Sequence, residues 1–306
     1  MAAFIAKRLL SLIPTLLIVV TLSFFLMRLA PGGPFDLERP LDPRVMENLK
    51  RIYQLDQPLF SQYFSYLSHL AQGDLGPSFY WRDFTVNELF ARALPVSMRL
   101  GVSALALALC VGAGVGVYAA LRQNKLGGQG AMALAALGVT TPLFVIAPLL
   151  QLVFGLWLGW LPQGGWSDGA WRNSMLPIVT LALPQTAIVA RLTRAAMIEA
   201  LRTPAQRTLR AYGLPQRVVT AHALRSAALP VVSWLGPAAA ALLTGSIVVE
   251  QVFGLPGVGR YFVEGALNRD YTLVMGTVVV VSVLTLLFNL AADIIYGLLD
   301  PRVRHE

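Results

Sequence analysis

Six long apolar runs dominate this sequence, and they constrain its fold more than any other feature. A run of about 20 apolar residues is long enough to cross the hydrocarbon core of a bilayer as a helix. Hydrophobic residues make up 56% of the chain and charged residues only 13%, which excludes an ordinary soluble domain. We therefore expect an all-α polytopic membrane protein with six transmembrane helices, at Leu9–Leu29, Val96–Leu121, Ala131–Trp160, Met175–Ala195, Leu229–Val249 and Leu273–Leu298.

The distribution of basic residues predicts the orientation of these spans. Six crossings leave both termini on one side, and the loops expected on that side carry the basic residues Lys7, Arg8, Arg122, Lys125, Arg302 and Arg304. Because basic residues accumulate in cytoplasmic loops, we expect both termini to be cytoplasmic. Lys7 and Arg8 precede an apolar run that is too long for a signal peptide, so we expect a retained first span. Topology accounts for the net charge of +8, and no nucleic-acid partner is expected.

Seven arginines lie between positions 191 and 225, and the loop from Glu199 to Pro230, which holds five of them, also carries ordered helix signals. Thr203 fits an N-cap, with Pro204 at the first helical position and Gln206 at the capping-box spacing. Gly213 suits the left-handed residue after a helix end. We predict a short helix at Pro204–Tyr212 with Ala205, Leu209 and Tyr212 on one face, a second helix from Pro215 to about Ala227, and a span starting at Pro230. A basic amphipathic segment lying on anionic lipid is the alternative.

In this loop Glu199–Ala200 is followed at a distance by Gly213, and this order resembles the EAA loop of ABC importer membrane subunits. Five blocks in register are similar to those of the oligopeptide and dipeptide permease family, and most similar to its B-type membrane subunit. They are residues 28–32, 207–214, 222–230, 250–259 and 299–302. The sequence departs from the family pattern at Pro204, Leu209 and Tyr212, which affects the details of docking.

The resemblance implies a type I ABC importer permease fold in the bacterial inner membrane. It divides the chain into a first transmembrane helix (1–29), a periplasmic segment (30–94), a transmembrane domain (95–300) with a cytoplasmic coupling loop (196–228), and a cytoplasmic tail (301–306). It also implies coupling to ATPases through Glu199, Ala200, Arg207, Leu209, Arg210, Ala211, Tyr212 and Gly213. The periplasmic gate region would include Glu250, Phe253, Gly254, Pro256, Gly257 and Gly259.

The same resemblance implies partners and a transport function. The partners would be a homologous second permease subunit, two cytoplasmic ATPase subunits, a periplasmic peptide-binding protein and a peptide substrate, in a lipid bilayer. The chain itself would bind no cofactor, because ATP and magnesium belong to the partner subunits. The implied function is import of oligopeptides, and dipeptides, glutathione or nickel stay open as alternatives.

Enzymatic activity finds no support in the residues. The three lysines, Lys7, Lys50 and Lys125, do not complete a phosphate-binding GxxxxGK[ST] loop, so this chain is not expected to hydrolyse ATP. The three histidines show no metal-ligand spacing, and no GxSxG motif occurs. A secondary transporter or channel working alone is a further alternative, and it should show inverted repeats or broken spans with intramembrane ions.

Several features inside the spans and the outer segment complete the expectations. Gly112 and Gly116 form a GxxxG pair that permits close helix packing. Asp293 is expected to pair with an arginine of the loop, with a proton relay as the alternative. In the outer segment we expect helices at Asp42–Tyr53 and Pro58–Ala71, which should pack on the spans or on a partner because so short a piece cannot bury a core of its own.

Overall fold

The computed structural model describes residues 2–29, 47, 51, 55–81 and 83–299. These residues form helices joined by turns, and no strand occurs among them apart from an isolated bridge between Pro77 and Thr85. The helices are α1 (Ala2–Leu29), α3 (Leu59–Ala71), α4 (Val86–Leu121), α5 (Leu126–Thr140), α6 (Leu143–Leu150), a π-helix (Gln151–Trp157), a 3₁₀ turn (Ser167–Gly169), α7 (Trp171–Leu201), α8 (Pro204–Ala211), α9 (Gln216–Ser233), α10 (Leu235–Phe253), α11 (Val258–Leu267) and α12 (Tyr271–Leu299).

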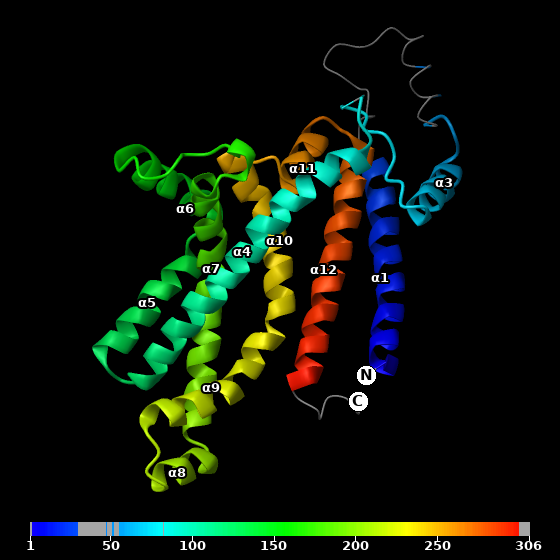
Figure 1. Cartoon of the computed structure of the whole chain (residues 1–306). Helices are drawn as coiled ribbons and strands as arrows, with labels where there is room; N and C mark the ends of the chain where they lie inside the picture. Colours follow the sequence, from blue (N-terminus) through cyan, green and yellow to red (C-terminus); the bar gives the residue numbers. More distant parts are fainter. Residues whose placement is uncertain (1, 30–46, 48–50, 52–54, 82, 300–306) are drawn as a thin grey trace.

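The long helices run side by side along one axis, with α8 at one end and α6 and α11 at the other (Figure 1). Five described helices are long and apolar enough to cross a membrane, in α1, α4, α7, α10 and α12. Each contains most of a predicted span, which confirms those five positions. α4 starts at Val86, ten residues before the predicted Val96, because Thr85 and Glu88 form a reciprocal capping box there.

The third predicted span, Ala131–Trp160, is not one continuous helix but falls on a sharply bent pair of helices. Leu126–Thr140 and Leu143–Trp157 are bent by 106° at a short break, so the pair is either a broken span or a re-entrant segment. Thr141 and Pro142 both adopt extended backbone conformations. The proline ring disfavours a helical conformation at the residue before it, which ends α5. A sixth crossing exists only if this bent pair is counted as one span.

The start of the fifth predicted span also needs correction. Pro230 lies inside α9, which continues to Ser233, and α10 begins at Leu235. Pro237 supplies the physical reason, because it lacks the N–H that a continuous helix would bond to the carbonyl of Ser233. At the junction, the indole Nε1 of Trp234 donates to Gln185 Oε1 of α7 over 3.2 Å.

Close packing between α4 and α7 forms the centre of the bundle. A Cβ atom added at Gly112 would lie 2.8 Å from the Thr186 carbonyl oxygen. One added at Gly116 would lie 2.6 Å from Thr193 Cβ. The predicted GxxxG pair therefore brings α4 against α7 of the same chain, as small residues do in membrane helix pairs.

The outer segment packs on the spans, as expected. α3 begins one residue after the predicted Pro58, and its Tyr63 hydroxyl lies 2.7 Å from the Thr21 hydroxyl of α1. Phe60 and Phe64 of the same helix are exposed. The helix predicted at Asp42–Tyr53 lies outside the described residues, apart from positions 47 and 51.

Asp270 joins the outer segment to the last helix. Its buried carboxylate accepts from the Ser78 hydroxyl (2.5 Å) and from the backbone N–H of Phe79 (2.9 Å) and Tyr80 (3.0 Å). Its second oxygen accepts from the N–H of Leu273, which caps the first turn of α12. One acidic side chain thus fixes the segment before α4 against the start of α12.

Candidate functional site

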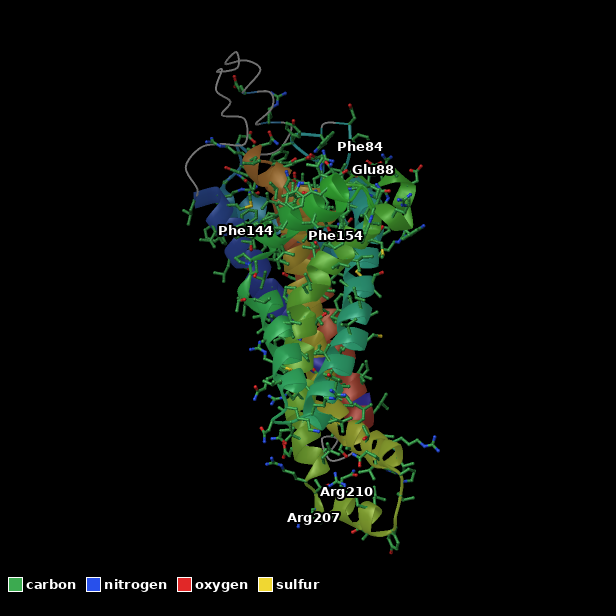
Figure 2. The ribbon with its side chains drawn as sticks, turned by 90° about the vertical axis from the view of Figure 1, so that its left-hand side faces the viewer. Phe84, Glu88, Phe144, Phe154, Arg207 and Arg210 are labelled. Carbon is green, nitrogen blue, oxygen red and sulfur yellow. The ribbon has the colours of Figure 1, made fainter. Side chains whose placement is uncertain are left out.

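The residues predicted to be functional form two clusters at opposite ends of the molecule. Figure 2 shows Arg207 and Arg210 at one end, and Phe84 and Glu88 at the other. The first cluster, the α8 end, comprises the last turn of α7, α8 and the start of α9. The second, the Glu250 cluster, lies where α4, α10 and α11 meet. Among the described residues, no group of three or more His, Cys, Asp or Glu side chains could hold a metal ion.

The α8 end begins in the last turn of α7. Glu199 is exposed there, whereas Ala200 is buried in a small core with Ala120 of α4 and with Ala223 and Ala227 of α9. Burial of Ala200 leaves no room for a larger side chain where three helices converge. Of the Glu199–Ala200 pair, Glu199 therefore faces outward and Ala200 packs in the core.

α8 itself forms almost as predicted, at Pro204–Ala211 with Tyr212 as its C-cap. Gly213 has φ +71°, the left-handed conformation that was expected of it. Its N–H donates to Arg210 O, and the Leu214 N–H donates to Leu209 O, which together make a Schellman ending. The glycine is required because a side chain with a Cβ is strained at this φ.

The predicted capping box at the start of α8 is absent. Thr203 makes no side-chain cap, and its hydroxyl instead donates to Ala200 O over 2.9 Å. Gln206 is buried and turns toward α9. With its amide oriented to satisfy both atoms, Nε2 donates to Val219 O (3.1 Å) and Oε1 accepts from Ala223 N (3.3 Å). Gln206 therefore fastens α8 to α9 rather than capping it.

The remaining surface of α8 is uncovered. Arg207, Arg210 and Ala211 are exposed, Leu209 is half-buried, and Tyr212 is 80% exposed. Ala205 is exposed too, so the predicted face of α8 points away from the bundle. A two-turn helix with a basic and aromatic outer face and one buried glutamine is suited to contact a further protein surface.

The Glu250 cluster is built around one fully buried carboxylate. Glu250 Oε1 accepts from the Ser97 hydroxyl of α4 over 2.6 Å, and Oε2 accepts from the Gly259 N–H over 2.7 Å. Ser97 in turn accepts from the Val258 N–H over 2.9 Å. These bonds hold the first turn of α11 against both α4 and α10. A buried carboxylate is tolerated only when its oxygens are hydrogen-bonded in this way.

Two of the predicted gate glycines are needed for close approach to Glu250. A Cβ at Gly257 would collide with the Glu250 carboxylate, and one at Gly259 would collide with the backbone of Ile247. Gly254 differs, because it is exposed and ends α10 in a left-handed conformation with φ +63°. Pro256 is half-buried in the same turn. The structure therefore brings Glu250, Gly257 and Gly259 into one cluster and leaves Gly254 at its edge.

Phe253 connects this cluster to the segment that follows the π-helix. Its carbonyl accepts from the Gly165 N–H over 2.9 Å, and its side chain is buried. Gln151 of the π-helix donates to Gln163 O (2.6 Å), and Asn173 of α7 donates to Gly164 O (3.1 Å). The end of α10 is thus held by residues that are far away in the sequence.

Sequence reasoning missed Ser97, Gln151, Asn173, Gln206 and Asp270 as members of these contacts. Each is a polar residue in an apolar or helical setting, and that is the signal by which they could have been noticed. Asp293 is half-buried on α12, and its pairing with a loop arginine stays a prediction.

Comparison with known families gives matches along most of the chain. Residues 112–305 match the model described as "Binding-protein-dependent transport system inner membrane component", and residues 1–88 match the N-terminal model of the same membrane component.

Two kinds of relative are similar over nearly the full length. The oligopeptide transport system permease proteins OppB of Haemophilus influenzae and of Escherichia coli are each 50% identical over 306 residues, covering 100% of both chains. The dipeptide transport system permease protein DppB of Bacillus subtilis is 42% identical over 305 residues, which is 99% of this chain and 98% of the relative.

Among solved structures, a chain of the inward-facing MetNI methionine ABC transporter is similar in fold. It has a TM-score of 0.59 at 18% identity and covers 69% of this chain and 96% of its own. At that identity the likeness shows the fold, and it agrees with the expected type I permease architecture.

Proposed function

This chain belongs to the family of binding-protein-dependent transport system inner membrane components, and on that premise we propose that it is the membrane-spanning subunit of an ATP-driven importer of oligopeptides. It is a transport subunit and not an enzyme. The observation that carries the proposal is the α8 end, where a short, capped helix presents a basic and aromatic face with no covering segment among the described residues.

The substrate class follows from the relatives. The full-length relatives at 50% identity are named for oligopeptide transport, which supports oligopeptides as the cargo. Dipeptides are the second candidate, because the relative at 42% identity is named for dipeptide transport and aligns over 99% of this chain.

The partners follow from the chemistry of each end. Two cytoplasmic ATPase subunits supply ATP and magnesium, since this chain has no phosphate-binding loop of its own. A homologous permease subunit completes the path through the membrane, and a periplasmic peptide-binding protein delivers the peptide. One ATPase receives Arg207, Arg210 and Tyr212 in a cleft of complementary charge.

The orientation in the bacterial inner membrane places the α8 end in the cytoplasm. Arginines of the α8 end lie on that side, as cytoplasmic loops favour basic residues. The start of α1 and the end of α12 lie toward the same end of the bundle (Figure 1), which supports cytoplasmic termini. The Glu250 cluster then lies on the periplasmic side.

The mechanism we infer is alternating access. ATPase closure displaces α8, and Gln206 transmits that displacement to α9 through Val219 and Ala223. α9 passes it to α7 through the shared core around Ala200 and to α10 across Trp234. The Glu250 cluster then changes its packing at the opposite end of α10. Coupling of this kind needs an element that the ATP-bound and the peptide-bound states both bias.

A secondary transporter working alone fits less well. One bent pair of helices exists, as that class of protein would show, but residues 126–157 contain no charged side chain. Ion-coupled transporters place ionisable or backbone ligands at such a break.

Purification and reconstitution test the proposal. The chain, coexpressed with its proposed partners, should copurify with two ATPase subunits, and vesicles should accumulate labelled tripeptide only when ATP and the binding protein are both supplied. Equal uptake by this chain alone, without ATP, would refute the importer assignment. Uptake of dipeptides with exclusion of longer peptides would favour the second candidate.

A further inference from the structure

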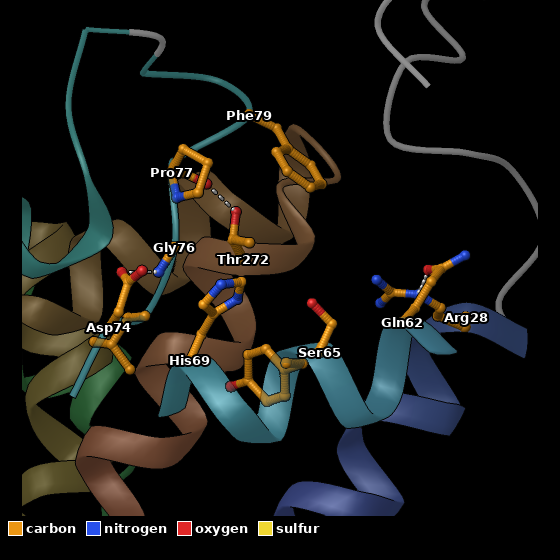
Figure 3. A pocket seen from close by; sticks show the side chains of 11 residues that line it. Arg28, Gln62, Ser65, His69, Asp74, Gly76, Pro77, Phe79 and Thr272 are labelled. Carbon is orange, nitrogen blue, oxygen red and sulfur yellow. Dashed lines mark hydrogen bonds between the residues drawn. The ribbon is translucent and has the colours of Figure 1, made fainter. Parts of the chain in front are cut away.

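A pocket of about 170 Å³ lies on the outer side, away from both functional clusters, between α1, α3, the turn at 74–77 and the start of α12. Figure 3 shows Arg28 and Gln62 at one end, Asp74 and Gly76 at the other, and Ser65 and His69 between them. Neither the α8 end nor the Glu250 cluster contributes a residue to it.

Arg28 is the one arginine or lysine among the described residues that line the pocket. Its Nε donates to Gln62 Oε1 over 2.8 Å, and its guanidinium lies 4.2 Å from the centre of the Phe24 ring. Gln62 is itself fixed, because its Nε2 donates to the carbonyl of Gln57 over 2.8 Å. Among the described residues no acidic side chain forms an ion pair with Arg28. The guanidinium is therefore held in place, and within the part of the chain that the structure describes the donors of its two terminal nitrogens stay available to a ligand.

Tyr66 also lines this pocket. Its hydroxyl is buried and has no hydrogen-bond partner among the described residues. Burial raises the pKa of Tyr66 to about 12, so the hydroxyl stays protonated and keeps its donor. A buried hydroxyl without a partner costs free energy, and a bound acceptor would recover it.

Two further polar groups of the pocket can donate as well. The Ser65 hydroxyl and the His69 ring point into the pocket, whereas the one carboxylate, Asp74, lies at the far end and accepts from the Gly76 N–H over 2.9 Å. A forked guanidinium beside hydroxyl donors matches the oxygens of a carboxylate or a phosphate. A cationic or neutral apolar ligand would leave those donors unused.

We propose that Arg28 and Tyr66 form a binding site for a singly charged oxyanion, either the carboxylate of a small peptide or the phosphate of an outer-leaflet lipid headgroup. The site is independent of the proposed transport cycle, since it shares no residue with the α8 end or the Glu250 cluster. Carboxylate and phosphate can each present two acceptor oxygens to a guanidinium, so the experiment must separate the two sources.

The test uses the complete importer in nanodiscs, without the binding protein. The probe is N-acetyl-alanyl-alanine, which has one carboxylate and no amine, and its C-terminal amide serves as the uncharged match. Isothermal titration compares wild type, Arg28→Gln, Tyr66→Phe and the control Arg92→Gln, which removes an exposed arginine of α4 outside the pocket. Native mass spectrometry of the same samples counts retained phospholipids.

For a peptide carboxylate, Arg28→Gln weakens binding of the acid by about ten- to hundredfold and Tyr66→Phe by about fivefold, with Arg92→Gln unchanged. For a lipid phosphate, both pocket variants retain one phospholipid fewer than wild type and Arg92→Gln. Tyr66→Phe keeps the ring, so it reports on the site even if Arg28→Gln fails to fold. If neither the titration nor the lipid count distinguishes the pocket variants from Arg92→Gln, the oxyanion site does not exist.

Discussion

The Ser97 hydroxyl of α4 donates to the Glu250 carboxylate of α10 over 2.6 Å, and both side chains are buried. These residues are 153 positions apart in the sequence, yet their bond lies at the point where α11 begins. The same Ser97 oxygen accepts from the Val258 N–H, so it is donor and acceptor at once. This pair therefore determines how α4, α10 and α11 sit together.

Ser97→Ala should weaken this junction. The change leaves Glu250 and the Val258 N–H each short of a partner inside the protein, at a cost of about 1–3 kcal/mol in the free energy of unfolding. Thermal unfolding of the purified complex measures it. Ser103→Ala, at a half-buried serine of the same helix, is the matched control and should change stability by less than about 0.5 kcal/mol. Equal stabilities of the two variants would contradict the role assigned to Ser97.

Gly116→Ala should force α4 away from α7, because the new Cβ would lie 2.6 Å from Thr193 Cβ and 2.7 Å from the Ala190 carbonyl oxygen. Overpacking of this kind costs about 1–3 kcal/mol. Gly114→Ala is the control, since nothing lies within 4 Å of a Cβ at that position. A cysteine pair across α4 and α7 measures the separation by crosslinking yield. A yield unaffected by Gly116→Ala would mean that the two helices do not pack this closely.

Gly213→Ile should uncouple ATP hydrolysis from peptide uptake. A β-branched residue is strained at φ +71°, by about 1–2 kcal/mol or more, so the ending of α8 changes. The membrane level of the chain should stay normal, because Gly213 lies outside the spans. Uptake and ATPase activity are measured in the same vesicles. Gly213→Asn tolerates the left-handed conformation and should keep most uptake. Wild-type uptake with isoleucine would remove the basis for assigning docking to α8.

Gln206→Leu should loosen α8 from α9 and lower transport. The substitution keeps most of the side-chain volume but removes both bonds to Val219 and Ala223. Because the neighbouring backbone groups of α9 have helical partners, we expect a modest loss of stability, about 1 kcal/mol, and a larger loss of coupling. Hydrogen exchange over residues 204–214 reports on the loosening. Gln216→Leu, at an exposed glutamine, is the control, and faster exchange in both variants would argue against a specific role for Gln206.

Tyr66 should make stability decline at high pH. Its pKa is raised to about 12 by burial, against an ordinary value near 10, so the unfolded chain loses this proton first. The stabilisation is complete below pH 10 and is lost as the pH rises toward 12, by about 2–3 kcal/mol in total. Tyr66→Phe should flatten this part of the stability curve, and Tyr80→Phe, at an exposed tyrosine, should not. Phenolate absorbance at high pH gives the titration directly, and a midpoint near pH 10 for Tyr66 would rule out the buried environment.

Local signals in the sequence were enough for α8, because Pro204 and Gly213 each act through their own backbone conformation. The capping box predicted for Thr203 and Gln206 was wrong, because contacts with another helix decide where the Gln206 side chain lies. Both side chains have a local option, the capping box, but α9 offers Gln206 two backbone partners that no local pattern reveals. Tertiary contacts override such propensities.

The same contrast between local signals and tertiary contacts applies to the membrane helices and to the buried acidic residues. Hydropathy located five membrane helices, yet it could not show that Thr141 and Pro142 end a helix rather than kink it, since the apolar run continues on both sides. Glu250 was predicted to belong to a gate region, but its partner Ser97 lies on another helix and follows no spacing rule. Asp270 was overlooked, although an acid just before an apolar run is a common helix cap.

The bend between α5 and α6 has a consequence for biosynthesis. Residues 126–157 form an uncharged stretch longer than a membrane crossing requires, so the insertion machinery meets it as one continuous hydrophobic segment. What later keeps α5 in place is contact with α7, where a Cβ at Gly138 would lie 2.7 Å from the Leu183 carbonyl oxygen. Because α7 follows this stretch in the chain, the contact between α5 and α7 can form only after α7 has also been synthesised.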